Sequence, residues 1–331
     1  MTVDLRWFSP NRFGTLVVPG LRAAGFTVAT DGNEPARAVV AIDAQVAVES
    51  YEYARRHRCP LGLFIWDLPP WRLGNGRPDA VFELRGRIRR VSRIVGGYRE
   101  RAGFYSRLRY IAQHSAMVWA PSSATVSDLH DRFGVTAGLL PFCFDSDRFT
   151  RGEWIPRCPP RLFSVSRLVP HKNLAAIIRA AARMTPRPTV HFIGQGPEGP
   201  SLRALGAQLE VPVELMADRQ SDDAVLEGYR AATVVVAPSR FEGFGLAALE
   251  GLASGIPVAA SDIPAHREAL GDAAHLFGLE DDLSLVAAIR SALERGPAES
   301  APADLRIEAA AARFAEHLIR LLPRPDLRLR R

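Results

Sequence analysis

Short apolar runs alternate with stretches of helical periodicity along most of this 331-residue chain. The apolar runs are VDLRWF, AVVAID, LGLFIW and AMVWAP in the first half, and LFSVSRL, TVHFIG, ATVVVAPS and IPVAAS in the second. Between them lie stretches such as NLAAIIRAAARM, whose apolar residues recur three and four positions apart. Short buried runs that alternate with helices are typical of parallel sheets with crossover helices. The sequence therefore predicts an α/β protein.

The alternation pauses at TRGEWIPRCPPRL, residues 150–162, whose prolines, glycine and charges are typical of a linker. The chain is also longer than most single domains. We therefore predict two doubly wound domains, residues 1–152 and 161–305, joined by a linker at 153–160. A last helical pattern, RIEAAAARFAEHLIRLL, and a basic tail occupy 306–331. The sequence leaves open whether this helix packs on the second domain or crosses back to the first.

Several classes of protein are disfavoured by the composition. The chain contains no run of roughly 18 apolar residues, so no membrane-spanning helix is expected. Its first residues, MTVDLRWFSP, lack the basic and apolar regions of a signal peptide. Cys59, Cys143 and Cys158 are few and widely spaced, which argues against a disulfide framework or a zinc site. These features predict a cytoplasmic protein without a bound metal.

Positive charge is concentrated in the first half of the chain. The net charge is +6, and residues 1–150 carry 20 arginines against 14 acidic residues. Residues 85–109 hold nine arginines and one acidic residue, with apolar residues at helical spacing. This pattern favours peripheral docking on an anionic membrane surface, at its inner face. The alternative is a solvated face in an arginine-rich chain; slight aromatic interleaving makes nucleic acid an unlikely partner.

A single lysine, Lys172, stands among 42 basic residues; the other 41 are arginine. A lysine retained in such a chain is expected where a compact ammonium is needed and a planar guanidinium does not fit. Chance survival is the alternative.

The stretch SRFEGFGLAALEGLASGIPV, which begins at Ser239, carries the chemistry. It follows a buried strand, so the loop RFEGFG is expected at the carboxyl edge of a sheet, where ligands bind in open α/β proteins. A helix is predicted from near Gly245 to Gly255. Gly243 and Gly245 allow a ligand to approach the backbone, and free N–H groups at the helix start favour a phosphate.

Helical phase separates the two glutamates of this stretch. Glu250 lies four residues after Leu246, on the apolar side of the helix, and a carboxylate there needs a partner. A buried arginine, backbone donors or ligand hydroxyls would serve, and an internal ion pair is the alternative. Glu242 lies in the loop and is expected to reach the cleft, or else to be an ordinary loop charge near the helix dipole.

The stretch resembles the E-x7-E region of retaining GT-B glycosyltransferases, in particular glycosyltransferase family 4. The flanking segments LFSVSRLVPHKNLAAIIRAAARM, VHFIGQGPEGPSLRALGAQL, VLEGYRAATVVVAPS and IPAHREALGDAAHLF resemble the same family in the same order. The likeness is strong over about residues 161–278. In the first half, WAPSSATVSDLHDRFGV and LPFCFDSDRF match more moderately. The resemblance implies the GT-B architecture, in which two Rossmann-like domains face a cleft.

The resemblance also implies roles for individual residues. Arg167 and Lys172 match the basic pair that holds the donor diphosphate, Glu250 the glutamate on the nucleotide ribose, and Glu242 the glutamate near the transferred sugar. Further donor contacts are expected at Gly243, Phe244, Gly245, Leu246, Gly194, Gly196 and Gly14. The family reaction retains the anomeric configuration, with no metal ion and no cofactor besides the sugar nucleotide. Two fixed cations and a helix start would stabilise the leaving diphosphate.

The first half departs from the family pattern at LFIWDLPPW. Many relatives have a histidine where this chain has Trp66, followed here by Asp67. Asp67 or Trp66 is expected to replace that histidine, or Trp66 is a core or acceptor-stacking aromatic. This departure keeps a non-catalytic sugar-nucleotide-binding subunit open as an alternative, beside a GT-B sugar-nucleotide epimerase.

Two further alternatives are weaker. GQGPEG, from Gly194 to Gly199, has the dinucleotide-binding spacing, with Glu214 as the acidic residue 20 positions after Gly194. Pro197 disturbs that turn, and the motif lies in the middle of a domain. A glycosidase would also use paired carboxylates, but not within a phosphate-binding α/β context.

The sequence therefore predicts a retaining hexosyltransferase of polysaccharide biosynthesis. Its donor would be a GDP- or UDP-linked sugar, and its acceptor a glycan or a lipid-linked sugar. Likeness to mannosyltransferases around WDLPPW favours mannose.

Overall fold

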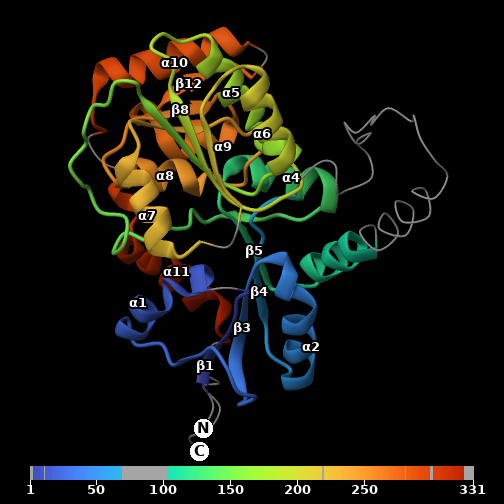
Figure 1. Ribbon diagram of the computed structural model, residues 1–331. Coiled ribbons are helices and arrows are strands. Elements are labelled where there is room, and N and C mark those ends of the chain that lie inside the picture. The colour runs from blue at the N-terminus through green and yellow to red at the C-terminus, as the bar shows by residue number, and fades with distance from the viewer. Residues whose placement is uncertain are drawn as a thin grey trace, which may run out of the picture. The chain divides into compact units, whose positions relative to one another are not determined.

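The computed structural model describes residues 3–10, 12–68, 103–217, 220–279, 281–298 and 301–323. The chain divides into two compact units (Figure 1). Unit 1 comprises Met1–Phe142 and Glu308–Arg331, and unit 2 comprises Cys143–Ile307. Each unit is an α/β structure built on one sheet, so the predicted fold class is confirmed.

Unit 1 contains a six-stranded parallel sheet in the order β2-β1-β3-β4-β5-β6. The strands are β1 (Val3–Phe8), β2 (Val28–Ala29), β3 (Ala36–Ile42), β4 (Leu61–Phe64), β5 (Met117–Ala120) and β6 (Gly138–Leu139). The helices are α1 (Val18–Ala23), α2 (Ala47–His57), residues 103–113, α4 (Ser123–Phe133) and α11 (Ile307–Leu321). The central strands β3 and β4 are buried along almost their whole length, as expected for a sheet covered on both faces.

Helix α11 packs on unit 1, although nearly 170 residues separate it from the end of that unit's first segment. Its Phe314 is fully buried and lies 5.9 Å from the ring of Trp7, 5.9 Å from Phe64 and 5.6 Å from Phe142. Helices α2 and α4 and residues 103–113 pack on a different cluster of sheet side chains. The helix therefore completes one face of the unit 1 sheet.

Unit 2 contains a second six-stranded parallel sheet, in the order β12-β11-β10-β7-β8-β9. The strands are β7 (Arg161–Val165), β8 (Thr189–Ile193), β9 (Val213–Met216), β10 (Val234–Ala237), β11 (Val258–Ser261) and β12 (His275–Phe277). The α-helices are α5 (Ala175–Ala182), α6 (Gly199–Gln208), α7 (Asp222–Ala231), α8 (Leu246–Ala253), α9 (Pro264–Leu270) and α10 (Asp282–Arg295). A short 3-10 helix, η5 (Pro170–Lys172), follows β7.

Helices cover both faces of the unit 2 sheet (Figure 1). Helices α5, α6 and α10 pack on a cluster that includes Phe192 and Val234. On the other face, α7 approaches Phe163 at Gly228, and α8 approaches Val235 at Gly251. This doubly wound arrangement leaves the carboxyl ends of the strands as the edge where a ligand would bind.

Among the described residues, no helix is both long enough and apolar enough to cross a membrane.

Candidate functional site

The site lies where the chain order of the unit 2 strands reverses. From β7 the next strands, β8 and β9, are added on one side, whereas β10, β11 and β12 are added on the other. The loops that follow β7 and β10 therefore diverge at the carboxyl edge, which is the switch point where open α/β sheets bind ligands. Lys172 ends η5 after β7, and Glu242 lies in the loop after β10.

Lys172 and Glu242 join these two loops. The Lys172 Nζ donates to the Glu242 Oε1 at 2.5 Å. The two side chains are only 14% and 19% exposed. An ion pair this little exposed is held by local contacts and is screened less by salt than a surface pair. The chain's single lysine and the first glutamate of the E-x7-E pattern are thus direct partners.

Two serines extend this pair into the core. Ser239 donates its hydroxyl to the Glu242 Oε1 at 2.6 Å, and Ser261 donates to the backbone oxygen of Ser239 at 2.5 Å. Burial raises the pKa of Glu242, but Lys172, His266 and the Ser239 hydrogen bond outweigh it, so the pKa lies below its ordinary value. Glu242 is therefore ionised at neutral pH.

His266, in α9, is a fully buried member of the network that the sequence analysis did not single out. Its Nδ1 lies 2.9 Å from the backbone oxygen of Ser261, which only accepts, so Nδ1 carries the proton. The Nε2 is buried and has no partner within the described part of the chain. Burial, the main cause, lowers the pKa of His266. No local sequence pattern predicts a role for this histidine, because its neighbours in the structure come from other segments of the chain.

The start of α8 provides an anion-binding end. Gly245 is its N-cap and has a φ of 87°, a left-handed conformation that favours glycine. A Cβ at Gly245 would lie 2.7 Å from the His266 Cδ2, so the position also lacks room for a side chain. Within the described residues, the backbone N–H groups of Phe244, Gly245 and Leu246 donate to no acceptor. Such a helix start favours a phosphate or another oxygen-rich group.

Glu250, on α8, is half-buried, as its helical phase predicted. Its partner is Tyr229 of α7, whose hydroxyl lies 2.9 Å from the Glu250 Oε2. Burial is the main cause that raises the pKa of Glu250 to about 7; the Tyr229 hydrogen bond lowers it, and the nearby charges of Asp145 and Asp222 raise it further. The helical phase of Glu250 predicted a partner but did not identify it as a tyrosine. The available signal was a phenol in the amphipathic helix VLEGYRAA, because a buried tyrosine hydroxyl usually finds a hydrogen-bond partner.

The glycine loop after β8 packs against the loop after β7. A Cβ at Gly194 would lie 1.7 Å from the Ser166 oxygen, and one at Gly196 would lie 2.2 Å from the Leu168 oxygen. Leu168 also donates its backbone N–H to the Gln195 oxygen at 2.8 Å. These glycines therefore allow two loops to lie in contact at the carboxyl edge.

Two charged residues near these loops have clear placements. The side chain of Arg167 is exposed and pairs with no residue in the described part of the chain. Glu214 lies within β9 and pairs with Arg161 at 2.8 Å. Because an ion pair on the sheet accounts for Glu214, the dinucleotide-binding interpretation loses its acidic residue.

Unit 1 carries the remaining predicted residues. Asp67 follows β4 and is half-buried. The Trp66 ring lies 5.1 Å from Phe64 and 4.8 Å from Phe142, so it packs with core aromatics of this unit. The backbone oxygen of Gly14 accepts from the Trp7 Nε1 at 2.9 Å.

The basic stretch falls mostly outside the described residues. Of residues 85–109, only 103–109 are described, and they are helical, with Arg107 and Arg109 exposed and Tyr105 and Leu108 buried.

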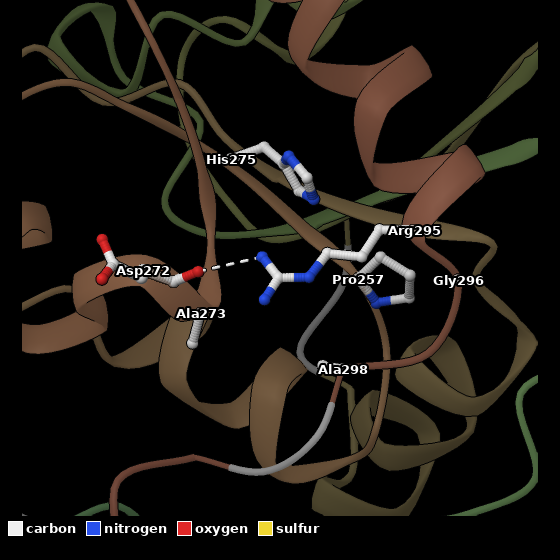
Figure 2. Close-up of a pocket in the computed structure, with 7 residues that line it drawn as sticks. All are labelled: Pro257, Asp272, Ala273, His275, Arg295, Gly296 and Ala298. Carbon is white, nitrogen blue, oxygen red and sulfur yellow. Dashed lines mark hydrogen bonds between the residues drawn. The ribbon is translucent and has the colours of Figure 1, made fainter.

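A separate cavity lies at the opposite edge of the unit 2 sheet. It has a volume of about 210 Å³ and is lined by Pro257, Asp272, Ala273, His275, Arg295, Gly296 and Ala298 (Figure 2). Pro257 precedes β11 and His275 begins β12, which places the cavity at the amino ends of these strands. Arg295 donates to the backbone oxygen of Asp272 at 3.0 Å. The cavity is therefore distinct from the Lys172 site.

No group of three or more histidine, cysteine or acidic side chains gathers in a metal-binding arrangement among the residues the structure describes.

Comparison with known proteins identifies a family and several relatives. The profile of the family described as Glycosyl transferases group 1 matches residues 147–313. A D-inositol 3-phosphate glycosyltransferase of Geodermatophilus obscurus is 34% identical over 191 residues, covering 47% of this chain and 40% of that protein. A lipopolysaccharide core biosynthesis mannosyltransferase, LpsB, of Rhizobium meliloti is 47% identical over 58 residues, covering 17% of this chain and 16% of that protein.

Among solved structures, Anabaena HepE in complex with UDP-glucose has a TM-score of 0.65 at 14% identity, covering 96% of this chain and 97% of that one. At this identity the likeness concerns the fold. The chain spans less than half the length of the curated relatives it matches, 28% and 40% for two D-inositol 3-phosphate glycosyltransferases.

Proposed function

The chain belongs to the glycosyl transferases group 1 and has the two-domain GT-B fold, and from that premise we propose that it moves a hexose from a nucleotide diphosphate sugar to a glycan or lipid-linked acceptor, with retention of anomeric configuration. The observation that carries the proposal is the Lys172–Glu242 pair beside the free start of α8, at the switch point of the unit 2 sheet. For the donor, which the sequence predicts to be GDP- or UDP-linked, the likeness to HepE, which was solved with UDP-glucose, supports the UDP-linked form. Mannose as the sugar is supported by the LpsB likeness.

In this proposal the donor diphosphate lies between the η5 turn and the start of α8. Lys172 uses one N–H on Glu242 and keeps two more for phosphate oxygens. Arg167 and the N–H groups of Gly245 and Leu246 add donors on the same group. These fixed charges and dipoles stabilise the negative charge that develops on the leaving diphosphate. Removing one such group typically slows the reaction by about two orders of magnitude.

Glu242 would contact the transferred sugar, and Glu250 the ribose. An ionised Glu242 accepts hydrogen bonds from sugar hydroxyls, while Ser239 and Lys172 fix its position. Gly194 and Gly196 keep the surrounding backbone close and free of side chains. Asp67 and Gly14, in unit 1, are assigned from the sequence resemblance alone. The proposal requires no metal ion and no cofactor.

The test is a binding and hydrolysis screen of UDP-, GDP- and ADP-sugars. We expect one class to bind, and Lys172→Ala to weaken its binding at least tenfold. The matched control is Arg290→Ala, because Arg290 is an exposed cation of the same unit and lies on α10, outside these loops. The proposal is refuted if no sugar nucleotide binds, or if Lys172→Ala binds as well as the wild type.

One observation favours a second candidate, a sugar-nucleotide-binding subunit without transferase activity. The position where relatives have a histidine holds Trp66, which packs against Phe64 and Phe142. Donor binding without release of free nucleotide, with or without added acceptor glycans, would favour this candidate. Turnover that is lost in Asp67→Asn would exclude it.

A further inference from the structure

Tyr229 is a fully buried residue whose hydroxyl touches the proposed nucleoside subsite. The phenol oxygen lies 2.8 Å from the backbone oxygen of Ala247 and 2.9 Å from the Glu250 Oε2. The Phe149 ring lies 5.5 Å from the Tyr229 ring, and the Phe163 ring 5.0 Å, both edge-on. The ring is therefore fixed from two sides, and the hydroxyl has little freedom to leave either oxygen.

A tyrosine hydroxyl has one proton, which can serve both oxygens only as a shared three-centre bond. A carbonyl oxygen and a carboxylate oxygen are both acceptors only. If Tyr229 donates to Glu250, its lone pairs face the Ala247 oxygen at 2.8 Å without a proton between them, and the reverse choice leaves the Glu250 contact without one. Both contacts are satisfied when the carboxyl group carries the second proton. Glu250 then donates to Tyr229, and Tyr229 donates to Ala247.

The charges around Glu250 favour this neutral form. Burial, the largest cause, together with the charges of Asp145 and Asp222 raises the pKa of Glu250 to about 7, although the Tyr229 hydrogen bond by itself lowers it. Arg148 lies 3.8 Å from Asp145, 3.9 Å from Asp222 and 3.0 Å from Asp223. The nearby cation is therefore paired with aspartates, and Tyr229 is the group bonded to Glu250 itself.

We propose that Tyr229 is the positioning residue of the nucleoside subsite: it fixes the Glu250 carboxyl group, which carries a proton in the donor-free protein, and the ribose of an arriving nucleotide displaces that proton. This inference rests on the proposed function. In the bound state the ribose hydroxyls and Tyr229 all donate to the Glu250 carboxylate, and the displaced proton goes to solvent. No covalent bond changes apart from this O–H.

Binding therefore releases a proton and tightens as the pH rises. At pH 6, one unit below a pKa of about 7, about 0.9 protons are released per nucleotide, and at pH 8 about 0.1. Below pH 7 the affinity falls about tenfold per pH unit, since the free protein must lose the proton first.

The experiment is calorimetric titration of the full chain with UDP-glucose and GDP-mannose, in buffers that differ in ionisation enthalpy. Both ends of the diphosphate are esterified in these ligands, so the phosphates do not titrate near pH 7. Glu250→Gln is the matched control because its amide still bonds to Tyr229 but has no acidic proton. We expect proton release in the wild type and none in Glu250→Gln.

Tyr229→Phe separates positioning from simple packing. We expect this substitution to lower the affinity for UDP-glucose or GDP-mannose about tenfold. We expect no effect on the matching 2′,3′-dideoxy sugar nucleotide, which has no hydroxyls for Glu250. A packing role alone would weaken both ligands equally.

Equal proton release by wild type and Glu250→Gln overturns the inference, as does an equal effect of Tyr229→Phe on both ligands. In either case Lys172-dependent binding leaves the proposed function standing. Absence of any sugar-nucleotide binding overturns both.

Discussion

Replacing Lys172 with methionine leaves Glu242 buried without its cation. The side chains pair at 2.5 Å and are 14% and 19% exposed, so water does little to compensate. Unit charges about 4 Å apart attract each other by roughly 4 kcal/mol at an effective dielectric constant near 20. Removing one partner of a buried pair typically costs about 3–5 kcal/mol. Because Ser239 still donates to Glu242, we expect Lys172→Met to lower the free energy of unfolding by about 3 kcal/mol.

The double variant Lys172→Met/Glu242→Gln tests whether this cost comes from the pair. It leaves no buried charge, so its cost should fall below the sum of the two single variants by about 2 kcal/mol. Arg290→Met serves as the control. This exposed cation on α10 should change the free energy of unfolding by no more than about 0.5 kcal/mol. Urea unfolding followed by circular dichroism measures all four variants.

The pH dependence gives a second check with a definite sign. In the wild type, Lys172 and its neighbours hold the pKa of Glu242 below its ordinary value. The pair therefore stabilises the fold above the unfolded pKa, and this contribution is lost as the pH falls through the folded one. In Lys172→Met, burial without the cation raises the pKa, so folded Glu242 takes up a proton first. The gap between wild type and variant should thus shrink from pH 7 to pH 4.5. Additive single costs, or a gap independent of pH, would refute the reasoning.

Three further predictions concern the same loops and the basic stretch. In calorimetry, Glu242→Gln should lower the affinity for UDP-glucose or GDP-mannose more than the affinity for UDP or GDP, because the carboxylate is assigned to the sugar. Equal losses of affinity would contradict that role. Gly245→Ala should lower the free energy of unfolding by about 2 kcal/mol or more, since φ is 87° and the new Cβ meets His266. The control Gly134→Ala, where φ is 66° in the same left-handed region and the new Cβ would meet only the Gln113 Nε2 at 3.9 Å, should cost only about 1 kcal/mol. If residues 85–109 bind an anionic membrane surface, the protein should co-sediment with anionic vesicles at low salt and remain in the supernatant at high salt. Absence of binding at every salt concentration rules out the membrane surface.

The buried strands could be predicted from the sequence because both faces of each sheet are covered. β1 (Val3–Phe8) coincides with the run VDLRWF, and β8 (Thr189–Ile193) lies within TVHFIG. The apolar runs did not include β9 (Val213–Met216) and β12 (His275–Phe277), which lie at the edges of the unit 2 sheet. Their side chains are half-buried or exposed for the most part, so they lack the continuous apolar run that marks a central strand.

The position of α11 was not available from the sequence. Its amphipathic pattern predicted a helix over the right residues, but its partner depends on rings from distant segments. Phe314 meets Trp7 of β1, Phe64 of β4 and Phe142. No local pattern shows that these three rings form one apolar surface.

The same limit applies to the site. Lys172, Glu242 and Glu250 could be selected from motif and composition, but their partners could not. Tyr229 lies on a different helix from Glu250, and His266 reaches the Glu242 loop through Ser261. Hydrogen bonds of this kind depend on which loops meet at the carboxyl edge. Strand order determines that meeting, and the local sequence does not encode it.

The structure offers a physical reason for the single lysine. Lys172 bonds to Glu242 through one N–H of a small ammonium, and its remaining donors are free to turn toward a phosphate. An arginine would bind the carboxylate with a rigid planar fork, which commits two donors in one direction and needs more room. Ser239 already occupies the same Glu242 oxygen, so a bidentate pair would compete with it. In a chain where every other basic residue is arginine, this geometry explains why an exchange at position 172 would be unfavourable.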